Sequence, residues 1–140
     1  DIIRAGQNEN VNAHFIGSIV YIEKGLYQVS SQSPILVIDG QQRLTTITLL
    51  LSALIEKLST LPVENQEIID GFSPKKLKNY YLCNPEEDGE KYYKLILSKT
   101  DKDSLISIVN GKEMPKNFSN RIKNNFEFFK EQIAKNSDKL

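Results

Sequence analysis

Apolar residues gather in three short runs near the start of the chain, and each run has the length and composition of a β-strand. Residues 14–23, HFIGSIVYIE, are rich in β-branched and aromatic side chains on both faces, which predicts a buried strand. A turn at Lys24-Gly25 then predicts a hairpin to a second strand at 26–30. Residues 35–39, ILVID, predict a third short apolar strand.

From Gly40 onward the apolar period changes from that of a strand to that of a helix. Apolar side chains recur at helical spacing between positions 44 and 58, which predicts a helix over 40–59 that ends before Pro62. Because its apolar surface covers more than one face, we expect this helix to lie at the centre of the core.

The rest of the chain has the pattern of a mainly helical half. We expect a short helix at 74–82, an exposed acidic loop at 84–90 and a strand at 92–98, followed by two more helices. The first of these covers 101–111, and the second follows the capping residue Ser119 with one apolar stripe: Ile122, Phe126, Phe129 and Ile133.

These elements predict an α+β fold, with a small mixed sheet packed on the central helix and followed by the mainly helical half. We divide the chain into a core at 1–61 and a continuation of the same domain at 62–140. Because the first residue is not methionine and the last residues still have a helical pattern, we expect a piece of a longer protein, truncated at both ends.

Composition and charge narrow the class of protein. The 140 residues are 39% hydrophobic and 26% charged, as is typical of one globular domain. Basic and acidic residues balance at 18 each, so only a local patch would attract a polyanion. No apolar run reaches the roughly 20 residues of a membrane span, and the single cysteine excludes an internal disulfide. We therefore expect a cytoplasmic protein without membrane contact; a homo-oligomer remains open.

The turn between the third strand and the helix, DGQQR at 39–43, has two interpretations. In the first it is purely structural. Asp39 stands where an N-cap is expected and Gln42 follows three residues later, which is close to a capping box. Gly40 then only eases the tight turn.

In the second interpretation the turn binds an anion. A cation in the first helical turn faces the positive end of the helix dipole, at a cost of a few tenths to about 1 kcal/mol, unless an anion lies there. Arg43 would then grip phosphate with its guanidinium fork, and Thr45 and Thr46 would add hydroxyl donors. Gln41 and Gln42 would hydrogen-bond a base, a ribose or a water.

Three more residues belong to this second interpretation. Asp39 would hold Mg²⁺ or orient an attacking water, which it cannot easily do with the oxygen that caps the helix. Gly17, inside an apolar strand, indicates either a close backbone approach that opens space near the turn or a glycine that relieves packing. Ser18 follows it and joins Gly17 as a candidate for phosphate binding.

The residues of this region carry a resemblance to a known family. HFIGSIVYIEKG followed by VIDGQQRLTTITLLLSAL resembles the bacterial and archaeal family built around a DGQQR motif, the N-terminal domains of GmrSD-type, type IV restriction enzymes. The fold of that family is similar to ParB and sulfiredoxin. The resemblance is strongest over 14–58, and KLILSKTDKDSLISIV and SNRIKNNFEFFKEQI extend it toward the end of the chain.

This resemblance implies an NTP-binding and NTP-hydrolysing module of a DNA restriction or phage-defence protein. Its ligands would be a nucleotide and Mg²⁺, and the full-length protein would bind DNA. The motif carries over to Asp39, Gly40, Gln41, Gln42 and Arg43, with Asp39 and Arg43 as catalytic residues and Asp39 as metal ligand. The alternatives are a ParB-like DNA-binding or nicking domain without nucleotide turnover, and a non-catalytic scaffold.

Two parts of the family pattern are missing from this sequence. They are an upstream segment with a Gln-Arg pair and a C-terminal His-Asn-His nuclease domain, whose metal site His14 alone cannot supply. Activity of this fragment alone is therefore an open question. The lysines within 73–79 suit either nucleic acid or a solvated helix face, and Cys83 has no nearby base in sequence.

Overall fold

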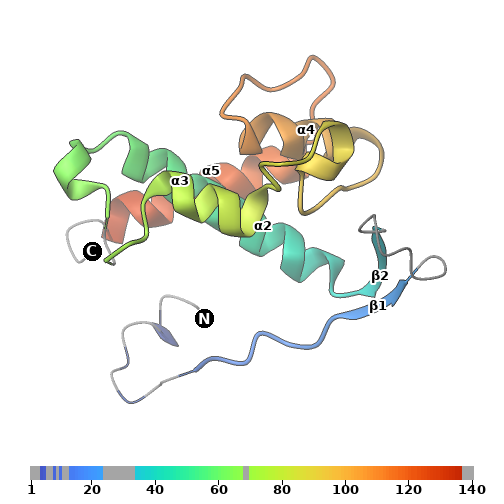
Figure 1. Ribbon diagram of the computed structural model, residues 1–140, viewed down its shortest axis with the longest axis horizontal. Coiled ribbons are helices and arrows are strands. Elements are labelled where there is room, and N and C mark those ends of the chain that lie inside the picture. The colour runs from blue at the N-terminus through green and yellow to red at the C-terminus, as the bar shows by residue number, and fades with distance from the viewer. Residues whose placement is uncertain are drawn as a thin grey trace. The chain divides into compact units, whose positions relative to one another are not determined.

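A computed structural model describes residues 4–5, 8, 10, 13–23, 34–67 and 70–136 (Figure 1). The chain forms two compact units, Asp1–Arg43 and Leu44–Leu140, and each is described by itself. This boundary falls near the start of the long helix rather than at 61, and the division into functional parts stays a prediction. The strand predicted at 26–30 lies outside the described residues.

The first unit contains a two-stranded antiparallel sheet. Strand β1 covers Val20–Glu23 and strand β2 covers Ile35–Asp39. Tyr21 pairs with Val37, but the neighbouring Val20 pairs with Asp39, so the register shifts by one residue at this point. This β-bulge lies at the end of β2 that leads into the DGQQR turn.

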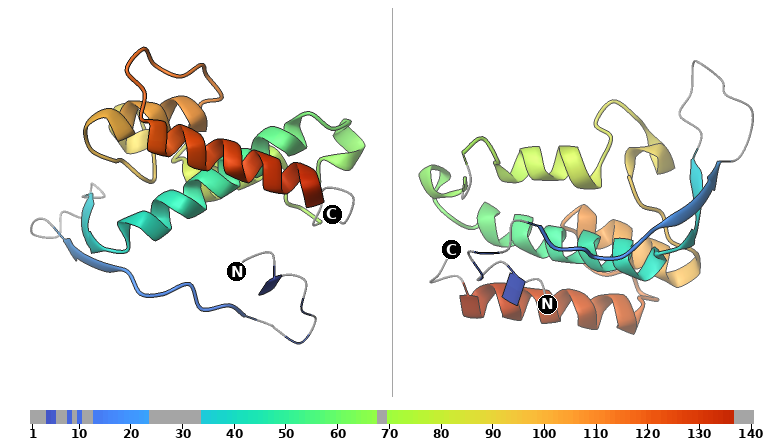
Figure 2. Two further views of the ribbon diagram at one scale, coloured as in Figure 1. Left: turned by 180° about the vertical axis from the view of Figure 1, so that it is seen from behind. Right: turned by 90° about the horizontal axis from the view of Figure 1, so that it is seen from below.

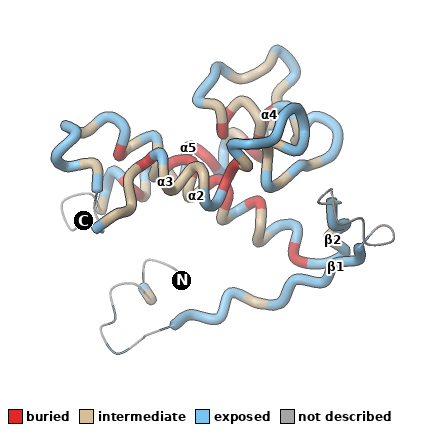
Figure 3. The backbone as a smooth tube through the Cα atoms, in the orientation of Figure 1, coloured by how far each residue is buried: buried red, intermediate tan, exposed pale blue. Residues whose placement is uncertain are grey.

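The prediction of a buried strand at 14–23 is wrong for the described residues. Both strands are largely exposed (Figure 3), with Val20 51% and Ile38 55% accessible. An apolar pattern on both faces calls for a layer on each side of a sheet. Such layers are missing among the described residues of Asp1–Arg43, and both strands are accordingly exposed.

The helix predicted at 40–59 is confirmed as α2, Gln41–Ser59. From Leu44 onward α2 belongs to the second unit, where it contributes the fully buried Leu49 and Ala53 to the core. The predicted central position of this helix in the core is therefore confirmed within that unit. The core cluster is made of Leu49, Ala53, Leu82, Cys83, Leu105, Ile108, Val109, Ile122, Phe126 and Ile133.

A short 3-10 turn, η1 (Val63–Asn65), follows α2, and the helix predicted at 74–82 is then found in two parts. Helix α3 covers Pro74–Leu77, and a π-helical turn, η2, covers Lys78–Leu82. Ser73 caps α3 by accepting a hydrogen bond from the Lys76 N–H at 3.3 Å. The widened turn closes with the Cys83 N–H donating to the Lys78 carbonyl at 2.9 Å.

The strand predicted at 92–98 is wrong. Gly89–Tyr92 forms a 3-10 turn, η3, and the residues after it are extended, with a single isolated bridge between Cys83 and Tyr93. The alternating apolar pattern is nevertheless real, because Tyr93, Leu95 and Leu97 are partly buried against the core. The segment packs one side on the core without a ladder of strand hydrogen bonds.

The two last predicted helices are confirmed as α4, Lys99–Val109, and α5, Asn120–Asn136. As expected from the sequence, Ser119 lies before α5, and its hydroxyl accepts a hydrogen bond from the Ile122 N–H at 3.4 Å. Figure 2 shows α5 beside α2, and Lys130 of α5 contacts Glu56 of α2 at 2.8 Å. The α+β class is therefore confirmed, with a small antiparallel sheet and a mainly helical second unit.

Candidate functional site

The DGQQR turn and the residues before β1 lie next to each other because the two strands are antiparallel. The Val20–Asp39 pair places the end of β2 opposite the start of β1. The chain leaves β2 through Gly40, and Gly17 and Ser18 precede the start of the neighbouring strand, β1. All of these residues belong to the first unit.

Gly40 is required by the geometry of this turn. Its φ of +96° is in the region that side chains rarely adopt, and the residue is buried. A Cβ at this position would lie 3.0 Å from Ile19 Cγ1 and 3.2 Å from the Ser18 carbonyl oxygen. The glycine therefore permits both the backbone conformation and the close approach of the neighbouring strand.

Arg43 joins the start of α2 to the end of β2 and to the residues just before β1. Its Nη2 donates a hydrogen bond to the Ser18 carbonyl and another, at 3.1 Å, to Asp39 Oδ2. Its Nε is buried and finds no acceptor among the described residues. The side chain is nevertheless 37% exposed. The two hydrogen bonds therefore fix the Arg43 side chain in place while part of this side chain faces solvent.

Gly17 lies directly against this guanidinium. With φ at +100°, a Cβ at position 17 would be 2.5 Å from Arg43 Nη1 and 3.1 Å from its Cζ. Of the two interpretations of Gly17, the geometry therefore agrees with the close backbone approach. A role for Gly17 or Ser18 in binding phosphate stays a prediction.

Asp39 is the last residue of β2, and Gly40 stands between it and the first residue of α2. Its carboxylate is 70% exposed and pairs with Arg43. The carboxylate in this ion pair supplies negative charge near the first turn of α2. An arginine at that position is therefore explained by Asp39 as well as by a bound anion.

The remaining motif residues have different surroundings. Gln41 donates from Nε2 to the Val37 carbonyl at 2.8 Å, which ties the first helical residue back to β2. Gln42 is exposed at the surface of the turn. Thr45 is buried and Thr46 is exposed, and both belong to the second unit. Their role in binding phosphate stays a prediction.

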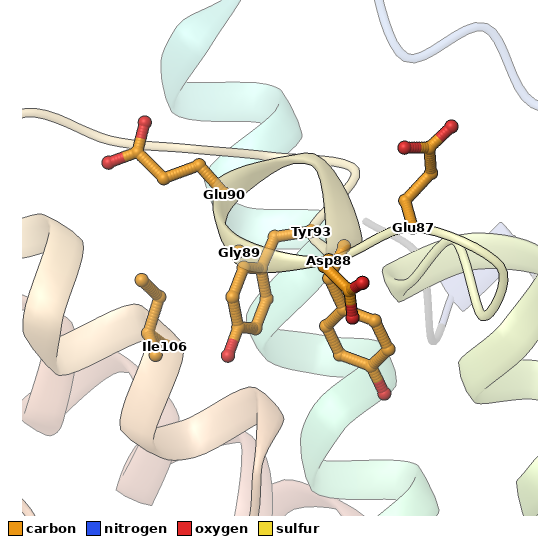
Figure 4. A pocket seen from close by; sticks show the side chains of 7 residues that line it. Glu87, Asp88, Gly89, Glu90, Tyr93 and Ile106 are labelled. Atoms are coloured by element: carbon orange, nitrogen blue, oxygen red, sulfur yellow. The ribbon is translucent and has the colours of Figure 1, made fainter.

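A separate pocket lies in the second unit, around the 3-10 turn η3 (Figure 4). Acidic side chains line it together with the rings of Tyr92 and Tyr93 and with Ile106 of α4; the acidic residues are Glu87, Asp88 and Glu90. Glu90 is paired with Lys102 of α4, and this hydrogen bond raises the pKa of the Lys102 ammonium. Three carboxylates would repel phosphate, so this pocket is not a second candidate for the anion site.

Tyr92, which lines the pocket, also lies against the buried thiol of Cys83. The hydrogen bond with Cys83 raises the pKa of Tyr92, and burial raises it further. This pair could not be predicted from the sequence, because the two residues are nine positions apart and meet only through the turn between them.

One lysine of the segment at 73–79, Lys76, contacts aromatic rings within its own unit. Lys76 Nζ lies 4.9 Å from the centre of the Phe72 ring and 5.7 Å from that of Tyr80. Both distances are in the range of a cation–π contact, so this ammonium already has aromatic partners within its own unit.

Neither a metal cluster nor a membrane segment is found in the described part of the chain. Groups of three or more histidine, cysteine or acidic side chains with metal-binding geometry are missing among the described residues. The described helices also include none with the length and apolar character needed to cross a membrane.

Comparison with known proteins places the chain in a family. The sequence model of "GmrSD restriction endonuclease, N-terminal domain" matches residues 1–140. No curated protein and no solved structure shows a significant match to the chain.

Proposed function

The chain belongs to the family of N-terminal domains of GmrSD restriction endonucleases, and from this we propose that it is the nucleotide-binding and nucleotide-hydrolysing module of a DNA restriction or phage-defence protein. The observation that carries the proposal is the Arg43 side chain in the first turn of α2, which two hydrogen bonds hold in place and which is 37% exposed. Backbone N–H groups at a helix start favour phosphate, and a guanidinium beside them adds a bidentate donor.

The other motif residues have roles consistent with a triphosphate. Gln41 and Gln42 would contact the nucleotide or position a water, and Asp39 would act on metal or water. With Oδ2 paired to Arg43, Asp39 has its other oxygen to offer a cation, and its 70% exposure leaves that oxygen accessible. One carboxylate together with substrate phosphates is an ordinary ligand set for Mg²⁺, which would neutralise phosphate charge when bound.

Calorimetric titration tests this proposal directly. The four ribonucleoside triphosphates, each with Mg²⁺, are titrated into the parent chain, Arg43→Ala and Arg121→Ala. Arg121 is the matched control, since it has the same charge and an aspartate partner, Asp101, but lies on α5. Charge-assisted hydrogen bonds contribute about 1.5–3 kcal/mol, so Arg43→Ala should bind roughly ten- to a hundredfold more weakly than the parent.

Each outcome has a clear meaning. Equal binding by the parent and Arg43→Ala would remove Arg43 from the site. Binding by none of the three chains would refute nucleotide binding by this segment. DNA binding that needs no nucleotide and weakens steeply with salt would favour the ParB-like alternative instead.

A further inference from the structure

We infer that Gly17 and the Ser18 carbonyl form a backbone clamp that positions the Arg43 side chain at the start of α2. In this view neither residue touches the anion, and both act on it only through Arg43. The clamp itself follows from the contacts within the first unit, and only its effect on nucleotide affinity rests on the proposed function.

The steric half of the clamp is the missing side chain at position 17. A Cβ there would come within 3.2 Å of three Arg43 atoms, Nη1, Cζ and Cδ, with the nearest at 2.5 Å. The contact therefore runs along the outer part of the side chain rather than touching one atom. Because that part is flexible, an added methyl group would displace the guanidinium before it displaced the strands.

The polar half of the clamp is the Ser18 carbonyl, which accepts from Arg43 Nη2. Asp39 accepts from the same nitrogen, but its carboxylate is 70% exposed and can turn toward solvent or a metal. A backbone carbonyl cannot turn away in this manner. It therefore keeps the guanidinium in place even when Asp39 changes partner.

The buried Nε of Arg43 provides a readout that does not depend on any ligand. The chain has three arginines, Arg4, Arg43 and Arg121, so the Nε–Hε region of a ¹⁵N spectrum is simple to assign. Gly17→Ala should shift the Arg43 Nε–Hε signal and speed its exchange with water, while the Arg121 signal stays unchanged. A spectrum in which Gly17→Ala leaves the Arg43 signal in place would overturn the clamp.

Two control variants separate the parts of the argument. Ser18→Ala keeps the carbonyl and should leave the Arg43 signal and nucleotide affinity unchanged, whereas a direct hydroxyl contact to phosphate would lower the affinity. Gly111→Ala also places a side chain at positive φ, +62°, but meets nothing within 4 Å. It should leave the Arg43 signal unchanged, so an equal shift in this variant would overturn the steric argument.

If Gly17→Ala instead unfolds the hairpin, the double variant with Arg43→Ala decides. The double variant keeps the strain of alanine at φ +100° but removes the clash, so it should recover part of the strand amide signals. A double variant as disordered as the single one would mean that the clash contributes nothing and would contradict the clamp.

Titration of Mg²⁺-nucleotide completes the test. Gly17→Ala should lose about as much affinity as Arg43→Ala, roughly ten- to a hundredfold, and the double variant should lose no more. A further loss in the double variant would mean that Gly17 acts directly and would overturn the inference. A shifted Arg43 signal without nucleotide binding by any chain would support the clamp and refute the proposed function.

Discussion

Substitution of Ser104 should expose how the last two helices are joined. Ser104 of α4 is fully buried, and its hydroxyl has two partners. It donates to the Thr100 carbonyl at 3.0 Å within its own helix, and it accepts from the Ser119 N–H at 2.8 Å, just before α5. Ser104→Ala removes both contacts while changing the volume by little more than one oxygen atom.

The expected cost can be worked out by comparison with Ser52 of α2. Ser52 is 5% exposed and donates to the Thr48 carbonyl at 2.8 Å, also four residues back. In both helices the carbonyl that accepts from the serine hydroxyl still accepts from a backbone N–H after the substitution. Alanine also has a better helix propensity than serine. Ser52→Ala should therefore change the free energy of unfolding by no more than about 0.5 kcal/mol. Ser104→Ala additionally leaves a partly buried N–H without its acceptor, which costs about 1–3 kcal/mol.

Urea unfolding followed by circular dichroism at 222 nm measures this difference. With a slope of about 2 kcal/mol/M, an extra cost of about 1 kcal/mol lowers the midpoint by roughly 0.5 M. Both serines lie in the unit Leu44–Leu140, so the same transition reports on each. Equal midpoints for the two variants would refute the assignment of the Ser104–Ser119 hydrogen bond as a stabilising link.

The remaining predictions concern the core and the pH dependence of stability. Leu49→Ala, at a fully buried position, should lower the free energy of unfolding by about 2–5 kcal/mol in the same assay, whereas Val63→Ala at an 82% exposed position should stay within about 0.5 kcal/mol. Hydrogen bonds from Ser119 and then Arg121 lower the pKa of the Asp101 carboxyl. A lowered pKa stabilises the fold above the ordinary aspartate value and loses that effect as the pH falls. The parent should therefore exceed Asp101→Asn in stability at pH 7, and the gap should close on acidification below about pH 5; a gap independent of pH would contradict this.

Elements with a strong local signal could be predicted from the sequence. The long helix, the strand before it and the last helix were all found where their patterns placed them. The close approach at Gly17 was one of two interpretations that the sequence left open, because a glycine inside an apolar strand also occurs where it only relieves packing.

The two strand predictions that were wrong share one physical cause. The periodicity of a sequence indicates which side chains are apolar, but not which residues cover them. The segment at 92–98 alternates because one side packs on the core, and hydrogen-bonded strand partners do not follow from that. The strand at 14–23 has apolar faces, yet the described residues of its own unit put nothing over them. The Arg43–Asp39 pair could not be predicted for a different reason: Asp39 belongs to β2, so the i,i+4 spacing within a helix does not predict this contact.

The contact between Ser18 and Arg43 leaves the length of chain between these two residues free to vary. It joins residues 25 positions apart, and the two ends are fixed by strand pairing and by two glycines. Lengthening the connection between the strands changes only the entropy of closing that loop, by about 0.6 kcal/mol for each doubling. The interval between the glycine-serine pair and DGQQR is thus free to drift, so a search pattern for such sites should contain two short motifs with a variable gap.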